Sequence, residues 1–242
     1  MEGKIMLNYD HFSINEATTL QNQLRQKLSN QTDIKDFTTI AGGDISHNKD
    51  TDIVYAGIVI LTYPQMVVQS YSLIESKTTF PYVPNYLGFR EVPSLLQAWE
   101  QLPVKPGVVV LDGQGITHPR RMGIASHFGL LIDHATIGCA KTMLFGHFPD
   151  LGTTKFSNSP ILSSDNELLG YALRTKYKVN PVYISPGHKM SVPDSLTIMK
   201  HCIQQHRIPE PTRQAHNYVN MLRTGQLQPG YYTANSQLGL FD

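Results

Sequence analysis

Cysteine, an excess of one charge and long apolar runs are all scarce in this chain of 242 residues. It holds two cysteines, Cys139 and Cys202, and its start, MEGKIMLNYD, lacks a charged-then-apolar leader. Both features favour a reducing cytoplasm over a secreted, disulfide-stabilised protein. The longest apolar runs, such as 107–111 and 128–132, are too short to span a bilayer. We therefore expect a cytoplasmic protein that does not enter a membrane.

The charges give little information about a partner. Twenty basic residues stand against 19 acidic ones, for a net charge of +1. This balance does not exclude a nucleic-acid enzyme, because bound metal ions or a local basic patch can supply positive charge where phosphate must lie.

The length and the 40% hydrophobic content are sufficient for a substantial core. No repeat, low-complexity block or Gly/Ser linker divides the chain. We expect a single domain over residues 1–242, acting as a monomer.

The order of the predicted elements favours an α/β fold. Ser13 and Glu16 have the spacing of a helix capping box, which predicts an N-terminal helix over 13–28. Three runs rich in Val, Ile, Thr and Tyr follow between 36 and 75 and are typical of an antiparallel meander. A helix is predicted over 90–102, a buried strand over 108–112, and alternating helices and strands thereafter. This order is that of a ribonuclease H-like mixed sheet flanked by helices.

Three acids are candidates for holding divalent metal. Asp44 lies at the end of the strand IAGGDIS, Asp112 ends VVVLD, and Glu91 begins the helix after a Pro-rich loop. Hard cations such as magnesium prefer several carboxylate oxygens from different chain segments, and ligands of open α/β sheets gather beyond the carboxyl ends of strands. Taken singly, Asp44 could be a solvated turn residue and Glu91 could favour the helix dipole. Asp112 is the stronger candidate, since a carboxylate directly after four apolar residues is costly to bury without a partner.

The block DGQGITHPRR follows Asp112 closely. Its glycines allow close approach of a phosphate backbone, and Arg120 or Arg121 could hold a phosphate bidentately. A turn and a helix with ordinary surface arginines is the simpler interpretation of each residue by itself.

At this point the sequence resembles the endonuclease V family, in six blocks that follow the order of the family. The blocks are IAGGDIS (40–46), PYVPNYLGFRE (81–91), VVVLDGQGITHPRRMGIASHFG (108–129), IGCAKTMLFG (137–146), PVYISPGHKMSV (181–192) and RIPEPTRQAH (207–216).

The resemblance implies roles for individual residues. Asp44, Glu91 and Asp112 match the acidic metal-binding set of the family, with magnesium as the cofactor and manganese as a substitute. His216 matches a histidine near the same metal centre. Lys141 matches the active-site lysine, which contacts phosphate or polarises a water.

His118 matches a histidine that the resemblance places on the substrate strand. The segment Pro81, Tyr82, Val83 and Pro84 matches the wedge of the family, and two prolines fix the loop so that Tyr82 can enter a base stack. A plain surface turn is the alternative interpretation.

An extruded base would then occupy a pocket. We expect backbone near Asn85, Leu87, Gly113 and Gly123 to line it. Asn85 stands where many members of the family have a small residue, often glycine, so the sequence does not decide the shape of the pocket at that position. Asn tolerates a left-handed backbone, which would preserve the loop.

The resemblance implies a nuclease of DNA repair that acts on DNA containing deoxyinosine. The resemblance also implies that the cut falls at the second phosphodiester on the 3′ side of the deaminated purine and leaves 3′-hydroxyl and 5′-phosphate ends. Two alternatives stay open within the same fold: an endoribonuclease that acts on inosine in RNA, and a lesion-binding protein without catalysis. A structural or interaction domain would leave the six blocks unexplained.

Overall fold

The computed structural model describes residues 8–34, 36–48 and 51–234, and in this part of the chain nine strands form one mixed sheet. Their spatial order is β6-β7-β8-β5-β4-β1-β2-β3-β9. The strands are β1 (Thr39–His47), β2 (Ile53–Thr62), β3 (Val68–Lys77), β4 (Val108–Leu111), β5 (Thr136–Ala140), β6 (Asn158–Leu162), β7 (Leu168–Leu173), β8 (Val182–Pro186) and β9 (Gly230–Thr233).

The centre of the sheet combines two kinds of pairing. The predicted meander β1-β2-β3 is antiparallel, whereas β4 pairs in parallel with both β1 and β5. Gly43 of β1 stands opposite Leu111 of β4. In a parallel pair the next residues along both strands are again neighbours, so Asp44 and Asp112 lie side by side where β4 ends.

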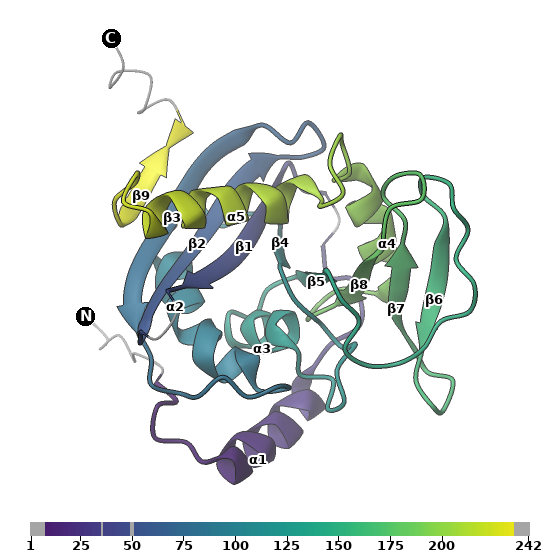
Figure 1. Ribbon diagram of the computed structural model, residues 1–242, viewed down its shortest axis with the longest axis horizontal. Coiled ribbons are helices and arrows are strands. Elements are labelled where there is room, and N and C mark those ends of the chain that lie inside the picture. The colour runs from purple at the N-terminus through teal and green to yellow at the C-terminus, as the bar shows by residue number, and fades with distance from the viewer. Residues whose placement is uncertain (1–7, 35, 49–50, 235–242) are drawn as a thin grey trace.

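Helices cover both faces of the sheet (Figure 1). One face packs against α2 (Leu87–Gln101) and α3 (Ile124–Leu131), which share an apolar cluster with β1, β2 and β4. The other face packs against α4 (Val192–His201) and α5 (Glu210–Arg223) through a second cluster. The N-terminal α1 (Ile14–Leu24) continues into a short 3-10 helix, η1 (Arg25–Lys27), and lies outside these layers, below α3 in Figure 1.

A glycine allows α5 to lie directly on β1. A Cβ atom at Gly42 would stand 1.8 Å from the carbonyl oxygen of Pro211, in the first turn of α5. Only glycine permits so close an approach of two backbones. The contact brings the rest of α5, including His216, above the strand that carries Asp44.

The mixed α/β architecture is the predicted one, with differences at element boundaries. The capping box of Ser13 and Glu16 is present, and α1 begins at Ile14. The helix expected over 90–102 begins earlier, at Leu87, because the loop before it ends in a left-handed turn at Asn85 (φ 70°). Glu91 therefore lies inside α2 and not at its start.

Two parts of the sheet were not predicted: the β6-β7 hairpin and the edge strand β9. Within the described residues, no helix is long and apolar enough to cross a membrane.

Candidate active site

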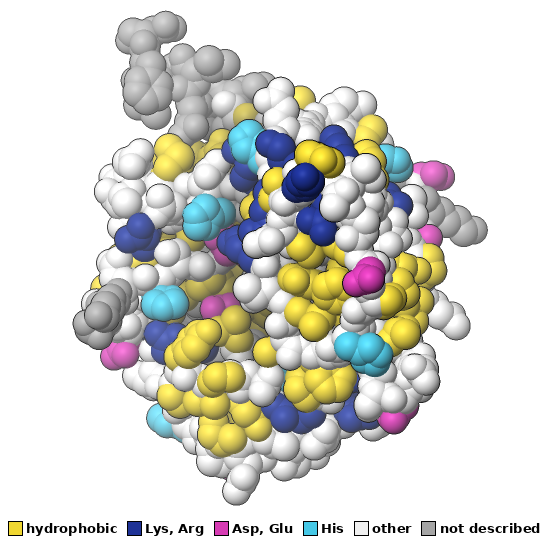
Figure 2. All heavy atoms as spheres, turned by 45° about the vertical axis from the view of Figure 1, so that its right-hand side comes forward, with side chains coloured by type: hydrophobic (Ala, Val, Ile, Leu, Met, Phe, Trp, Pro, Cys, Tyr) yellow, Lys and Arg dark blue, Asp and Glu magenta, His cyan; other side chains and the backbone are white. Residues whose placement is uncertain are grey.

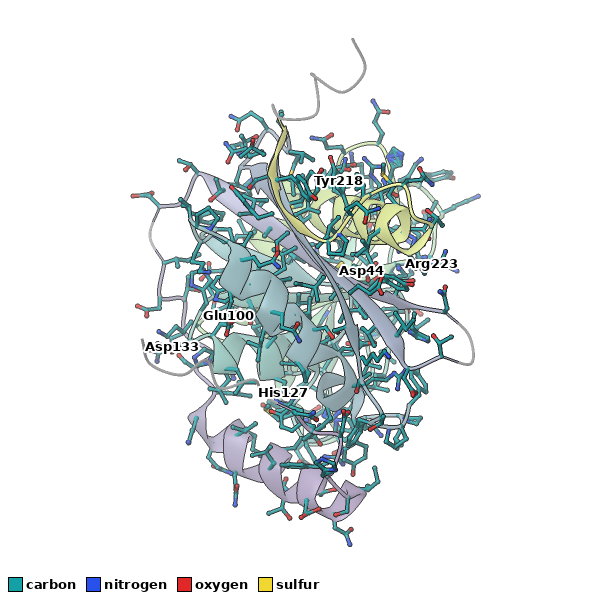
Figure 3. The ribbon with its side chains drawn as sticks, turned by 90° about the vertical axis from the view of Figure 1, so that its left-hand side faces the viewer. Asp44, Glu100, His127, Asp133, Tyr218 and Arg223 are labelled. Atoms are coloured by element: carbon teal, nitrogen blue, oxygen red, sulfur yellow. The ribbon has the colours of Figure 1, made fainter. Side chains whose placement is uncertain are left out.

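Acidic side chains from three elements converge beside a hollow of the surface. Figure 2 shows acidic side chains (magenta) in this hollow, with Lys and Arg side chains (dark blue) gathered above it. Asp44 of β1, Glu91 of α2 and Asp112 after β4 all line one small cavity of about 190 Å³. Figure 3 shows Asp44 beside α5, on the side of the sheet that also carries Tyr218 and Arg223.

Two basic side chains contact these carboxylates. The Lys141 ammonium, just beyond β5, forms an ion pair with Oδ2 of Asp112. Nδ1 of His216, on α5, lies 3.0 Å from Oδ2 of Asp44. Asp44 is 9% exposed and His216 is 57% exposed, so the imidazole faces solvent above a nearly buried carboxylate.

The crowding of negative charge shifts the pKa values of the whole group. Burial raises the pKa of Glu91 to about 8, and the charges of Asp44 and Asp112 add to the rise. Burial and Asp44 also raise the pKa of Asp112, against the effect of Lys141. The hydrogen bond to Asp44 raises the pKa of His216.

Lys141 is held in its charged form. Burial acts to lower the pKa of Lys141, but the hydrogen bond to Asp112 and the charges of Asp112 and Asp44 raise it overall. Arg207 fixes the backbone at this point, since its Nη2 donates to the carbonyl of Lys141 (3.0 Å) and to that of Pro181 (2.9 Å). Arg207 begins one of the six family blocks, but nothing in the sequence indicates this role.

The carboxylates are suited to a divalent cation, although they do not form a closed ligand cage. Within the described residues, no three His, Cys, Asp or Glu side chains stand close enough to bind one ion as they are placed. Lys141 forms an ion pair with Asp112, and His216 contacts Asp44. The carboxylate of Glu91 forms no hydrogen bond or ion pair with any side chain or backbone group of the described residues. Glu91 has a raised pKa and no hydrogen-bond donor, and it lies beside two further carboxylates. Such a group of oxygen ligands fits a hard cation.

A larger pocket adjoins the acids and opens under the Pro-rich loop. Its volume is about 330 Å³. From the expected set, it is lined by Tyr82, Val83, Pro84, Asn85, Leu87, Gly113, His118 and Gly123. Pro81 is exposed and does not line it. Asp112 and Lys141 line the same pocket, so the predicted base pocket and the acidic site share a wall.

The pocket also contains residues that sequence reasoning missed. Gln114 lines it and donates from Nε2 to the carbonyl of Thr142 (2.8 Å), which ties the loop after β4 to the loop after Lys141. Leu144 closes another side and is 44% exposed. The glutamine of DGQG was a visible signal, whereas nothing local singled out Leu144.

His118 supports the Pro-rich loop from inside the protein. It is 2% exposed, and its Nε2 donates to the carbonyl oxygen of Asn85 (3.0 Å). Its Nδ1 accepts from the backbone amides of Arg120 and Met122, which leaves the ring neutral. Burial lowers the pKa of His118 to about 4, which agrees with that state.

The two arginines of the HPRR block are likewise engaged within the protein. Arg120 donates to the carbonyl of Asn85 and to Oε1 of Gln21, and its guanidinium lies 4.6 Å from the ring centre of Tyr86. Arg121 forms an ion pair with Glu167 at 2.6 Å. In this structure both guanidinium groups are thus engaged by other groups of the protein, and a role in holding phosphate stays a prediction.

Gln21 of α1 completes the support of the loop. It is fully buried, and its Nε2 donates to the carbonyl of Asn85 (3.0 Å). That single oxygen therefore accepts from Gln21, His118 and Arg120. The end of the Pro-rich loop is fixed by donors from two distant segments, one of which is the N-terminal helix.

We expect Gln21→Leu to lower the free energy of unfolding by about 1–3 kcal/mol, because the guanidinium of Arg120 loses its buried acceptor and the Asn85 carbonyl loses a donor. Chemical denaturation measures this loss. Gln23→Leu, at an exposed position of the same helix, is the matched control and should change stability by less than about 0.5 kcal/mol. Equal effects of both substitutions would contradict the support role of Gln21.

The raised pKa of Glu91 gives a prediction for protein kept in a chelator. Between the ordinary value of 4.5 and about 8, the folded carboxyl keeps a proton that the unfolded one has lost. The folded state then binds more protons, so stability falls as the pH rises through this window. Glu91→Gln removes this contribution and should stabilise the protein more at pH 8 than at pH 5, as measured by Tm. Glu100→Gln, on the same helix, is the comparison, and an identical pH profile for wild type and Glu91→Gln would show that Glu91 is ionised throughout.

The chain is similar to known proteins both in sequence and in fold. The endonuclease V family model matches residues 22–217. Endonuclease V of Trichormus variabilis is 41% identical over 204 residues, which cover 84% of this chain and 92% of the relative. The crystal structure of endonuclease V from Streptomyces avermitilis superposes with a TM-score of 0.82 at 33% identity and covers 89% of this chain and 95% of that one.

A solved complex extends the comparison. Endonuclease V of Ciona intestinalis, bound to a 24mer DNA containing an inosine followed by a ribo-adenosine, superposes with a TM-score of 0.79 at 30% identity. The match covers 88% of this chain and 99% of that one. The shared fold is ribonuclease H-like, and the family consists in general of metal-dependent nucleases. The chain belongs to the endonuclease V family and is a nuclease.

Proposed function

We propose that this nuclease nicks a DNA strand at the second phosphodiester bond on the 3′ side of a deaminated purine, with deoxyinosine as the principal lesion. The observation that carries the proposal is the shared wall of the two cavities. Asp112 lines both the acidic cavity and the pocket under the Pro-rich loop. A base held in the pocket would therefore bring its own strand against the acids.

Recognition of the lesion rests on the loop and on the start of α2. Tyr82 is 67% exposed at the mouth of the pocket, on a loop held by Pro81 and Pro84. An exposed ring on a rigid loop can fill the gap that an extruded base leaves in the stack. Leu87 and Gly88, in the first turn of α2, line the pocket, and the first amides of a helix lack intrahelical acceptors. These amides suit the O6 and N7 acceptors of hypoxanthine.

Catalysis rests on the acids, Lys141 and His216. Magnesium, for which manganese can substitute, would be held by Asp44, Glu91 and Asp112 and would supply an activated water and neutralise charge on the leaving oxygen. Lys141 lines the base pocket and contacts Asp112, so its ammonium can turn from the carboxylate to a phosphate oxygen. His216 contacts Asp44 and faces solvent, where it can orient a water or exchange a proton. Expulsion of the 3′ oxygen leaves 3′-hydroxyl and 5′-phosphate ends.

RNA containing inosine is the second candidate substrate. The relative from Ciona intestinalis was crystallised with an inosine followed by a ribo-adenosine, so a ribose on the 3′ side of the lesion is compatible with that member of the family. Contacts to the 2′-hydroxyl distinguish RNA from DNA. Cleavage of matched DNA and RNA strands that carry one inosine decides between the two.

The purified protein with magnesium or manganese should cut an inosine strand at the stated bond, and Asp44→Ala and Asp112→Ala should abolish the cut. Both variants should keep their fold, since each removes one of several mutually repelling carboxylates. Mapping the product ends by electrophoresis tests the position. A normal rate in either variant would contradict the metal assignment, and binding of inosine strands without product under either metal would favour the non-catalytic alternative.

Tyr82→Ala should weaken lesion selectivity more than chemistry. Loss of one aromatic stacking partner costs about 1–3 kcal/mol, so the preference for inosine over adenosine strands should fall by roughly tenfold or more. The ratio of kcat/KM on the two strands measures it. Val67→Ala, at a similarly exposed hydrophobic side chain (61%) that does not line the pocket, is the control. Unchanged discrimination in Tyr82→Ala would remove the wedge role.

A further inference from the structure

Two loops beyond the active site form a surface that the proposed mechanism does not use. Residues 153–157 run beside residues 174–178, since the amide of Phe156 donates to the carbonyl of Arg174 (2.8 Å) and the amide of Lys178 to that of Thr153 (2.9 Å). We name this surface the basic-aromatic surface. It consists of Lys155, Phe156, Lys176, Tyr177 and Lys178.

The aromatic side chains of this surface are exposed to solvent, and part of its backbone is strained. Phe156 is 38% exposed and Tyr177 is 63% exposed. Phe156 also has a left-handed backbone (φ 69°), as does Lys178 (φ 55°). A bulky side chain in this conformation is a genuine outlier, and such strain is concentrated at binding and active sites. Neither Phe156 nor Tyr177 belongs to a hydrophobic core cluster of the described residues, so core packing does not account for them.

The backbone beneath these side chains is fixed. Arg174 donates to the carbonyls of Gly152, Val179 and Leu151 and so clamps both loops from within. The exposed rings are therefore presented on an ordered support. A preorganised support lowers the entropy that binding costs.

The charges of the surface are uncompensated. Across the described ranges, none of Lys155, Lys176 and Lys178 forms an ion pair with an acidic side chain. The Lys155 ammonium lies 4.8 Å from the ring centre of Phe156, and that of Lys178 lies 5.2 Å from the ring centre of Tyr177. Each aromatic face thus has a cation beside it, an arrangement that suits a base on the ring and a phosphate on the lysine.

The surface is joined to the active site by one side chain. Arg207 donates from Nε to the carbonyl of Asn180 (2.9 Å) and from Nη2 to the carbonyl of Lys141 (3.0 Å). The loop that carries Tyr177 and Lys178 therefore abuts the loop of the active-site lysine.

We propose that the basic-aromatic surface binds the substrate strand outside the active site, with phosphates on its lysines and an unpaired base on Phe156 or Tyr177. This inference rests on the proposed function for its substrate, a nucleic-acid strand. We expect a single strand and not a duplex, because an aromatic ring can stack only on a base that is not already stacked within a helix. Lysines alone could bind the phosphates of a duplex as well. DNA and RNA strands share this chemistry.

The test compares three variants on two inosine substrates. Lys155→Ala/Lys176→Ala removes two charges at residues with ordinary backbone angles, and Phe156→Asn/Tyr177→Ser removes both rings while keeping a residue that tolerates positive φ at 156. Lys200→Ala is the control, since it lies on α4, outside the surface. The substrates are a short oligonucleotide that ends within the active site and a long one that extends well past it.

On the long substrate, KM should rise roughly tenfold for the aromatic variant with kcat unchanged. For the lysine variant, the slope of log KM against log salt concentration should weaken by about 0.7 for each phosphate that the surface no longer neutralises. The short substrate and Lys200→Ala should behave as wild type. Three results would overturn the proposal. The first is an equal change in KM on the short and the long substrate, and the second is a wild-type KM of both surface variants on the long substrate. The third is a change in KM of Lys200→Ala as large as that of the surface variants.

Direct binding separates this inference from the proposed function. Fluorescence polarisation with an undamaged single strand in chelator reports the surface without any cleavage. Weaker binding by both surface variants supports the surface even if wild type leaves inosine strands uncut, and unchanged binding overturns it even if wild type cuts them. The same assay with single-stranded DNA, single-stranded RNA and duplex probes identifies which nucleic acid the surface binds. If wild type prefers the duplex and the aromatic variant keeps that preference, the single-strand assignment is contradicted.

Discussion

The parallel register between β1 and β4 is the constraint on which the site depends. It sets Asp44 and Asp112 side by side at the end of a buried strand, and α2 adds Glu91 from one face of the sheet. Three carboxylates so placed repel one another, and burial together with that repulsion raises the pKa of Glu91. Lys141 and His216 oppose it in the protein alone. The same two groups are the ones to which we assign a part in the proposed reaction, so one pair of side chains would serve both charge balance and chemistry.

The rigidity of the Pro-rich loop has a separate origin. Its prolines restrict the backbone, but its end is fixed by the carbonyl of Asn85, which accepts from Gln21, His118 and Arg120. Residues that resemble substrate contacts by type, an imidazole and a guanidinium, act here as donors to backbone. The loop thus presents Tyr82 to solvent, while three hydrogen bonds to the carbonyl of Asn85 fix the end of the loop.

Much of this arrangement could be predicted from the sequence, for physical reasons that differ between residues. Asp112 was evident because four apolar residues precede a carboxylate, and the meander was evident from its β-branched runs. The β6-β7 hairpin was missed because SNSPILSSDNELLGYAL carries a proline and many polar residues, and its pairing with β8 is settled only in three dimensions. The role of Gln21 was invisible for a similar reason, since its partners lie 64 and 99 residues away. The wedge role of Tyr82 stays a prediction, as do the metal ligands.

The docking of α5 on β1 also sets an order in which these side chains meet during synthesis. The acids of β1, α2 and β4 leave the ribosome before the imidazole that contacts Asp44, which comes 172 residues after Asp44 on a helix that docks by its first turn. A nascent chain that has not reached α5 leaves the face of β1 uncovered and Asp44 without His216. Translation thus delivers the imidazole after all three acids, and a product terminated before α5 would carry the acids without the helix that contacts Asp44.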